Sequence, residues 1–489
     1  MASLRTWIDT GLRGFPALLA RFGIVDRRMG EEAFRLATPV MVTGGLRILL
    51  RLADFVMVGI ALGGAGLAAL ELGFQYFFIG FALSLAVSSG TISVVARYEG
   101  ADQPEDADFA LKQSLWLSLA ISVPLTAIGW FYAPPLIDVL TDDPEAIRLG
   151  AAYLEVLMLS LAFRFWSLVA SRALAGTGDT RTPMFVRLFT LPTNVVLNAL
   201  LIFGLLGFPR LGIVGAAVGT AVTNTVTGLV FLGLALSGRY DVTLHLGGKQ
   251  WDTDVAREIL RVGVPLGGMR LLQTFGRFPF LFVLGTLGTP VLAAYAVGRR
   301  VVLLAMMPAW GYSTASSTLV GQAIGGDDDA EATRYGWQTL RIAVATQLLI
   351  AAAVFVLARP IVLLFNPNDV GLAVAFVRVF AVGVAGFSID RVMRGGLRGA
   401  GDTRWPLYGM FIGIFVLRLP IAFLALPASF VVTLAGVSIA PGLGAGLGAV
   451  FAAILVDLYA KAGINTLRFA SGRWQAIARE SEIGAAPEG

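Results

Sequence analysis

The sequence predicts an all-α, polytopic membrane protein of about twelve transmembrane helices in two pseudo-symmetric six-helix lobes. The 489 residues are 56% hydrophobic, with a mean hydropathy of +0.77, and only 14% are charged, against about 25% in soluble domains. Apolar stretches of about 20 residues, each long enough to cross a bilayer, recur along the chain. Because these stretches show no strict alternation of polar and apolar residues, they favour helices over barrel strands.

An internal repeat predicts the two lobes. Residues 175–183 read AGTGDTRTP and residues 398–406 read RGAGDTRWP, about 225 positions later. Pro39 and Pro265, each in an apolar segment, recur at nearly the same offset. Constant spacing indicates two homologous halves, and in a membrane protein such repeats place the substrate path between them.

The apolar stretches divide the chain in order. The first half has expected spans at 34–61, 66–96, 110–133, 146–171, 184–206 and 211–236. The second half has them at 256–286, 290–324, 336–358, 370–394, 406–427 and 440–464. The resulting organisation is an N-terminal interfacial segment 1–30, an N-lobe 31–236, a polar linker 237–255, a C-lobe 256–465 and a C-terminal tail 466–489.

The ends of the chain are expected to lie outside the hydrocarbon. Residues 1–30 place apolar side chains between arginines, which is typical of a short interfacial helix, here broken near Pro16. They lack the uninterrupted apolar core and the cleavage site of a signal peptide, so we expect them to be retained. The polar residues from Arg468 to Gly489 predict a loose end to the tail 466–489.

The basic residues predict the orientation. With the N-terminus inside, the inner segments hold most of the Lys and Arg residues, whereas the outer connections hold few, such as Arg148 and Arg210. This asymmetry predicts a plasma-membrane protein with both termini in the cytoplasm and parallel repeats related by an axis along the membrane normal. The net charge of +5 therefore reflects topology, and no nucleic-acid partner is expected. The absence of cysteine excludes disulfides and thiolate metal sites.

Asp54 is the foremost candidate for chemistry. It lies in the first span, where an ionisable residue is costly and usually faces a cavity or a partner. Asp54 is expected near the outer third of this span, so its protonation, or Na⁺ binding to it, could be coupled to access from the outside. The alternative is a structural ion pair with Arg51, which lies three residues earlier on the same helix face.

Asn194 and Asn198 lie four residues apart on one face of the fifth span, behind Pro192. Pro192 should loosen the helix and free a carbonyl about one turn back. Two amides, that carbonyl and Asp54 would make an oxygen-rich pocket suited to a hydrated proton or Na⁺. Interhelical hydrogen bonds are the equally weighted alternative.

The second half has no acid in the register of Asp54 and offers a secondary candidate set of Asp390, Arg418 and Gln273. Asp390 is expected to pair with Arg391 or Arg394. Arg418 lies in mid-span, so a buried pairing or an anionic substrate group must explain it. The repeated Gly-Asp-Thr loop predicts a helix connector, with Gly176 and Gly178 at positive φ and Asp179 as a cap. No Walker motif is present, so ATP is not the expected energy source.

Several of these segments resemble the multidrug and toxic compound extrusion (MATE) transporters. Leu52–Gly59 resembles the first helix of that family, the doubled Leu-x-Gly-x-Gly-Asp-Thr-Arg resembles its signature loop, and Ser316–Gln322 resembles its eighth helix. The resemblance covers roughly residues 31–465. It implies twelve helices in two lobes and export of drugs or toxic metabolites in exchange for H⁺ or Na⁺.

Position by position, the resemblance implies roles for single residues. Asp54 matches the acid that binds the coupling cation, and Asn194 matches a polar ligand beside it. Asn198 stands where some archaeal relatives have a second Asp. Asp390 matches an acid of the Na⁺-coupled branch, but the seventh-helix acid of that branch is not evident, so the similarity is closest to the DinF-like branch. Arg51 occupies a position that is commonly uncharged, and a guanidinium there favours the ionised form of Asp54.

Three functions follow as hypotheses. The first is a monomeric, cation-coupled exporter of small amphipathic organic compounds in the lipid bilayer, with no cofactor other than the coupling ion H⁺ or Na⁺. The second is a flippase for lipids or lipid-linked saccharides, which Arg277, Arg299 and Arg300 favour. The third is a membrane receptor or scaffold, against which the intramembrane acid and the symmetric halves argue. Nothing in the sequence indicates an enzyme.

Overall fold

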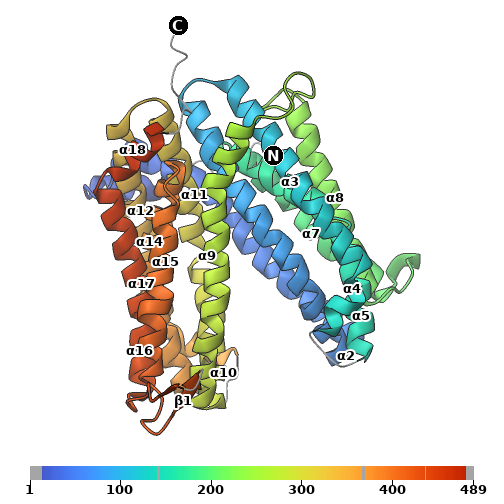
Figure 1. Cartoon of the computed structure of the whole chain (residues 1–489), viewed down its shortest axis with the longest axis vertical. Coiled ribbons are helices and arrows are strands. Elements are labelled where there is room, and N and C mark those ends of the chain that lie inside the picture. The colour runs from blue at the N-terminus through green and yellow to red at the C-terminus, as the bar shows by residue number, and fades with distance from the viewer. Residues whose placement is uncertain (1–13, 140–143, 366–368, 435–436, 481–489) are drawn as a thin grey trace. The chain divides into compact units, whose positions relative to one another are not determined.

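The computed structural model describes residues 14–139, 144–365, 369–434 and 437–480 (Figure 1). Fifteen side chains of helix α2, at positions between 49 and 78, lie outside the described set, as do those of Thr289 and of residues 432–439. The chain forms two compact units. The N-unit is Val42–Gly267 with Gly325–Asp327, and the C-unit contains the described residues of Met1–Met41, Gly268–Ile324 and Asp328–Glu482.

The helices of the first half, most of which lie in the N-unit, begin with α2. This helix, Arg27–Gly100, covers the first two predicted spans, and its blue ribbon runs as two stretches in Figure 1. It is followed by α3 (Pro104–Phe131), α4 (Ala133–Asp138), α5 (Pro144–Met158), α6 (Leu161–Gly176), α7 (Arg181–Phe203), a short 3₁₀ turn (Leu205–Gly207) and α8 (Ile213–Leu236). Helix α8 packs against α5, α6 and α7.

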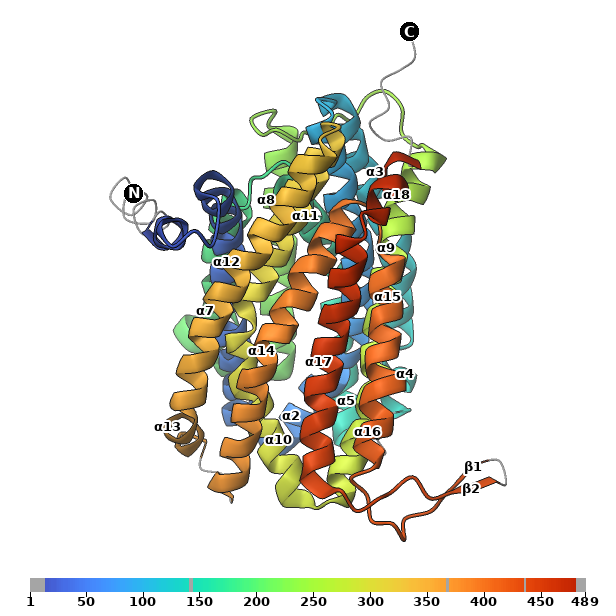
Figure 2. The same ribbon diagram turned by 90° about the vertical axis from the view of Figure 1, so that its left-hand side faces the viewer.

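The helices of the second half belong mainly to the C-unit. They are α9 (Thr253–Thr286), α10 (Thr289–Ala305), α11 (Met307–Gly325), α12 (Asp329–Val356), α13 (Ala358–Leu363), α14 (Val370–Gly399), α15 (Arg404–Phe411), a π-helical turn η2 (Ile412–Arg418), α16 (Leu419–Phe423), α17 (Gly446–Ala470) and α18 (Arg473–Glu480). Helix α14 packs between α12 and α17, as Figure 2 shows.

A helix or a bent helix pair occupies each predicted span, which confirms the all-α class. Within the described residues, eight helices are long and apolar enough to cross a membrane, and two bent pairs bring the number to as many as ten. The spans 146–171 and 290–324, which we expected to be continuous, are bent by 50° and 44°. At the first break the Ser160 hydroxyl donates to the Leu157 carbonyl (2.8 Å), a bond that bends helices. Pro308 follows the second break, where it suits the start of a new helix.

A short hairpin lies between the last two spans, where the sequence predicts no strands. Strands β1 (Val432–Leu434) and β2 (Val437–Ile439) pair antiparallel, with Val432 opposite Ile439. Their valine, threonine and isoleucine residues favour extended backbone. Helix α17 accordingly begins at Gly446 rather than at the expected residue 440.

The two compact units differ from the predicted lobes 31–236 and 256–465, because each unit includes a segment that was assigned to the other lobe. The start of α2, up to Met41, belongs to the C-unit, and the start of α9, up to Gly267, belongs to the N-unit. A Cβ at Gly311 would overlap the Ala37 carbonyl, and a Cβ at Gly263 would overlap the Ala86 carbonyl. The repeat spacing relates Ala37 to Gly263 and Ala86 to Gly311, so the two contacts join equivalent positions of the two halves. Both exchanged segments therefore depend on close backbone approach at a glycine.

The repeated loop has the same geometry in both halves. The N–H groups of Asp179 and Asp402 donate to the carbonyls of Leu174 and Leu397, both at 2.8 Å, and Gly178 and Gly401 have φ of 96° and 83°. This is the bonding of a Schellman helix end. The Asp179 carboxylate then accepts from the N–H groups that begin α7. Gly176 differs from our expectation: it is helical and allows close approach of Val95.

The described residues near both ends of the chain are packed, which corrects the prediction of a loose tail for residues 468–480. Trp474 is fully buried and stacks on Phe469, with ring centroids 4.9 Å apart. Val25 and Met29 of the N-terminal segment belong to the same apolar cluster of the C-unit. The large apolar area of Trp474 outweighs the polarity of its neighbours in the tail.

Candidate functional site

Asp54 and Arg51 lie in α2, but their side chains lie outside the described residues. The register of α2 still places Asp54 along the chain. Val58, one helical turn later, belongs to an apolar cluster that also contains Ile202 of α7 and Ala216 of α8. Asp54 therefore lies one turn from the level at which these three helices share a core.

Asn194 and Asn198 lie together on α7. The Asn198 side-chain amide donates to the Oδ1 atom of Asn194 (3.5 Å), and the Asn194 side-chain amide donates to the Thr220 hydroxyl of α8 (3.4 Å). Asn198 is 1% exposed. A Cβ at Gly219 would overlap the Asn198 Oδ1 atom, so the missing side chain creates the room for that oxygen. The structure thus brings the two predicted amides together and adds Thr220, which sequence reasoning missed.

Pro192 does not interrupt α7, which continues from Arg181 to Phe203. Proline has no N–H to donate to the carbonyl four residues earlier, that of Leu188. The Thr193 hydroxyl donates instead to the next carbonyl, that of Phe189 (2.8 Å). The predicted loosening of the helix is therefore limited to one missing backbone bond.

A second polar contact occurs at the break between α5 and α6. The Asn224 amide of α8 donates to the Ser160 hydroxyl (3.2 Å), and Ser160 is 1% exposed. Asn224 lies four residues after Thr220, on the same face of α8. The signal in the sequence was the spacing of Thr220 and Asn224, which repeats that of the two asparagines in α7.

In the C-unit, Asp390 forms a buried ion pair. It is 3% exposed, accepts from Arg394 on the same helix, and accepts from the Asn465 amide of α17 (2.7 Å). Arg394 also contacts the Met269 sulfur of α9 (3.6 Å). Of the two expected partners, Arg394 pairs with Asp390, whereas Arg391 stacks on Trp310 with its Cζ atom 4.7 Å from the ring centroid.

Gln273 contacts a different part of this region. It accepts from Arg270 (3.4 Å) and donates to the Met410 sulfur (3.7 Å). Arg270 also lies over the Trp310 ring, with its Cζ atom 5.7 Å from the ring centroid. Within the described residues, no hydrogen bond or ion pair joins Gln273, Asp390 and Arg418 to one another.

Arg418 has an acidic neighbour that the sequence analysis overlooked. Its Nη1 atom lies 3.7 Å from Asp457 of α17, and Asp457 also binds Lys461 at 2.8 Å. The guanidinium lies over Phe280, 3.9 Å from the ring centroid. Asp457 and Lys461 are four residues apart within an apolar span, and that spacing was the available signal.

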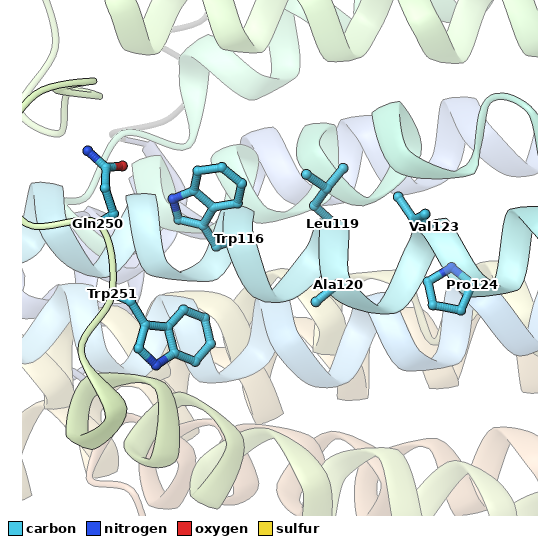
Figure 3. A pocket seen from close by; sticks show the side chains of 7 residues that line it. All are labelled: Trp116, Leu119, Ala120, Val123, Pro124, Gln250 and Trp251. Atoms are coloured by element: carbon cyan, nitrogen blue, oxygen red, sulfur yellow. The ribbon is translucent and has the colours of Figure 1, made fainter.

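An apolar cavity of about 500 Å³ lies elsewhere, on the N-unit. Trp116, Val123 and Pro124 of α3 line it, with Gln250 and Trp251 of the linker (Figure 3). It contains no charged side chain and none of the predicted site residues, so it offers an apolar surface rather than a coupling site.

Comparison with known proteins agrees with this architecture. The MatE family model matches residues 39–200 and 265–424. The probable multidrug resistance protein NorM of Thermotoga maritima is 30% identical over 462 residues, covering 91% of this chain and 93% of the relative. The protein of the same name from Rhodopseudomonas palustris is 29% identical over 435 residues, covering 87% and 90%.

Solved structures share the fold. A crystal structure of MATE in the straight conformation has a TM-score of 0.82 at 24% identity and covers 96% of this chain and 98% of that one. An outward-facing multidrug resistance MATE transporter of the MOP superfamily has a TM-score of 0.81 at 24% identity, with the same coverage. The family model matches well over half of the sequence, in both halves of the repeat. The chain therefore belongs to the MatE family: it is a multi-pass membrane transporter and not an enzyme.

Proposed function

We propose that the protein exports small, amphipathic organic compounds from the cell in exchange for H⁺ or Na⁺, by alternating access between its two lobes. The names of its relatives, probable multidrug resistance proteins, support drug-like substrates. The proposal includes a monomer in the plasma membrane with both termini in the cytoplasm.

The observation that carries the coupling proposal is the register of three helices in the N-unit. Asp54, Asn198 and Thr220 each lie about one turn from a residue of the same apolar cluster: Val58, Ile202 and Ala216. The predicted directions of the spans put all three polar residues on the same, inner side of that cluster. This arrangement supports a carboxylate, an amide and a hydroxyl at one depth, which is a ligand set for a proton or Na⁺.

The coupling depends on the charge of Asp54, which is neutralised when a proton or Na⁺ binds. An ionised Asp54 in an apolar lobe is costly, and protonation or Na⁺ binding removes that cost. A cation that stabilises one conformation more than the other shifts the population between them. Release on the opposite side would then return the lobes and drive export.

Transport of ethidium in proteoliposomes tests the proposal. We expect uphill transport to collapse when one of the two gradients, ΔpH or ΔNa⁺, is removed and to persist when the other is removed. The gradient that is needed identifies the coupling ion. Asp54→Asn mimics the protonated acid and should abolish uphill transport while the protein still inserts and folds. Asp138→Asn makes the same chemical change at an exposed acid of α4 and should transport normally. Full transport by Asp54→Asn would move the coupling site elsewhere, with Asp390 as the next residue to test.

A flippase for lipids or lipid-linked saccharides is the second candidate function. The exposed Arg277, Arg299 and Arg300 on α9 and α10 favour it, because arginines bind phosphate groups well. Scrambling of a fluorescent phospholipid between the leaflets of the same proteoliposomes, without ethidium transport, would favour this candidate over drug export.

A further inference from the structure

Two exposed arginines of the C-unit lie well inside helices for which the sequence predicts membrane spans. Arg277 precedes the outer end of α9 by nine residues, and Arg299 follows the start of α10 by ten. At 1.5 Å per residue each is about 14–15 Å from its helix end, close to half of a 30 Å hydrocarbon layer. Charged side chains at such depth face a partner or a water-filled cavity rather than lipid.

The aromatic contact between α9 and α10 brings these arginines to one level. Phe280 and Tyr295 are buried, and their ring centroids lie 5.6 Å apart. Arg277 is one turn before Phe280, and Arg299 is one turn after Tyr295. Because consecutive helices joined by a short turn are antiparallel, both arginines are displaced from the aromatic pair in the same direction. Arg277 accordingly lies within electrostatic reach of Arg299.

Arg418 adds a third guanidinium. It stacks on the same Phe280 ring, and it also lies within electrostatic reach of Arg277. Gly276 permits this approach, since a Cβ there would overlap Ile414 of the π-helical turn that ends at Arg418. Three helical segments therefore converge with a cation from each.

The cations exceed the acids available to neutralise them. Within the spans of the C-unit that the structure describes, the acids are Asp390 and Asp457. Asp390 pairs with Arg394, and Asp457 is shared by Lys461 at 2.8 Å and Arg418 at 3.7 Å. No described acid pairs with Arg277 or Arg299. Like charges at this depth repel one another strongly because the surroundings screen them poorly, and a bound anion would relieve the repulsion.

We propose that Arg277, Arg299 and Arg418 bind the anionic group of an organic ligand, a carboxylate, sulfonate or phosphate, within the C-unit. The inference rests on the proposed transport function and names a substrate class for it: organic anions, distinct from the cation that Asp54 would bind in the N-unit. Guanidinium groups suit such ligands because they donate paired hydrogen bonds in a plane.

Equilibrium binding to the purified protein in phosphatidylcholine nanodiscs tests the site. Carboxyfluorescein serves as the anionic probe and ethidium as the cationic one, both followed by fluorescence anisotropy. We expect the Arg277→Gln/Arg299→Gln double variant to bind carboxyfluorescein at least about ten-fold more weakly, which is 1.4 kcal/mol, and to bind ethidium no more weakly. Arg378→Gln is the matched control, since Arg378 is an exposed C-unit arginine whose guanidinium lies over Phe355 of α12. This variant should bind both probes normally.

A second arm identifies the source of the anion. The same dye titration is repeated in nanodiscs that contain one-fifth phosphatidylglycerol. If this lipid weakens carboxyfluorescein binding to the wild type but not to the double variant, the site binds a lipid headgroup. Unchanged dye affinity would assign it to soluble organic anions. Equal dye binding by the wild type and the double variant, an equal loss in Arg378→Gln, or no dye binding by the wild type would overturn the proposal. These measurements need no ion gradient, so their failure is distinct from a failure of cation-coupled export.

Discussion

At the scale of single residues, each buried acid in the C-unit has a cationic partner on its own helix and a second partner on another helical segment. Asp390 of α14 accepts from Arg394 and from Asn465 of α17, and Asp457 of α17 binds Lys461 and lies near Arg418. Removing one member of such a pair leaves the other charge buried and uncompensated. These carboxylates are therefore structural in the described conformation, whatever they do during transport.

Asp390→Ala should destabilise the protein by about 3–5 kcal/mol, because Arg394 would remain buried without its carboxylate. The measurement is the apparent unfolding temperature of the purified protein in detergent. The double variant Asp390→Leu/Arg394→Met removes both charges and should recover most of the loss. If Asp390→Ala melts like the wild type, the pair does not hold α14 as described.

At the scale of elements, small residues decide how closely helices approach. Gly219 on α8 admits the Asn198 oxygen, and Gly263 and Gly311 admit backbone carbonyls of α2. Each contact depends on a missing side chain rather than on a polar group. The candidate cation site thus rests on the packing of α7 against α8 as much as on its own amides.

Gly219→Ala should lower stability by about 1–3 kcal/mol, the usual cost of overpacking, and should impair ion-coupled transport because Asn198 must move. Gly233→Ala provides the control on the same helix: a Cβ there meets open space, and alanine favours a helix over glycine by up to about 1 kcal/mol. Thermal unfolding and ethidium transport of both variants check this. Equal behaviour of the two variants would show that α7 and α8 are less tightly packed at Asn198.

Asp252, just before the start of α9, predicts that the stability of the fold depends on pH. The pKa of Asp252 is lowered, first by its hydrogen bond from Lys249 and then by the N–H of Val255 and of Asp254. A carboxyl with a depressed pKa stabilises the fold above its ordinary pKa, and this contribution disappears as the pH falls through the lower, folded-state value. Asp252→Asn should therefore flatten the loss of unfolding temperature in acid. An unchanged acid profile in that variant would exclude Asp252 as a contributor.

At the scale of the whole molecule, the two sequence halves do not coincide with the two compact units. Residues 14–41 of the first half belong to the C-unit, and the start of α9 in the second half belongs to the N-unit. The equivalent contacts at Gly311 and Gly263 give this exchange the symmetry of the repeat. Each unit therefore contains a helical segment that is covalently continuous with the other.

Topology can be tested because the chain has no cysteine. A single Gly247→Cys substitution in the linker is sterically open, since nothing lies within 4 Å of a Cβ there. We expect it to resist a membrane-impermeant maleimide in intact cells and to react once the cells are opened. Leu206→Cys, at an 89% exposed site in the connection expected outside, should react in intact cells. Labelling of residue 247 from outside would reverse the proposed orientation.

By itself the sequence determined the features that depend on local pattern. Apolar length predicted the spans, the repeat predicted equivalent halves, and the doubled Gly-Asp-Thr loop predicted helix connectors that have the same geometry at Asp179 and Asp402. The same motifs identified the family. These properties are local because a span or a helix end is set by consecutive residues.

Only the tertiary structure decided the partners of the buried groups. It paired Asp390 with Asn465, placed Asp457 beside Arg418 and buried Trp474 in the tail. It also set Thr220 against Asn194 and gathered three arginines around Phe280 and Tyr295. A charged or aromatic side chain in an apolar helix needs a contacting partner. Which residue is that partner depends on which faces of distant helices pack together. That packing is a sum over many weak contacts between helices far apart in the chain, and no single stretch of sequence contains it.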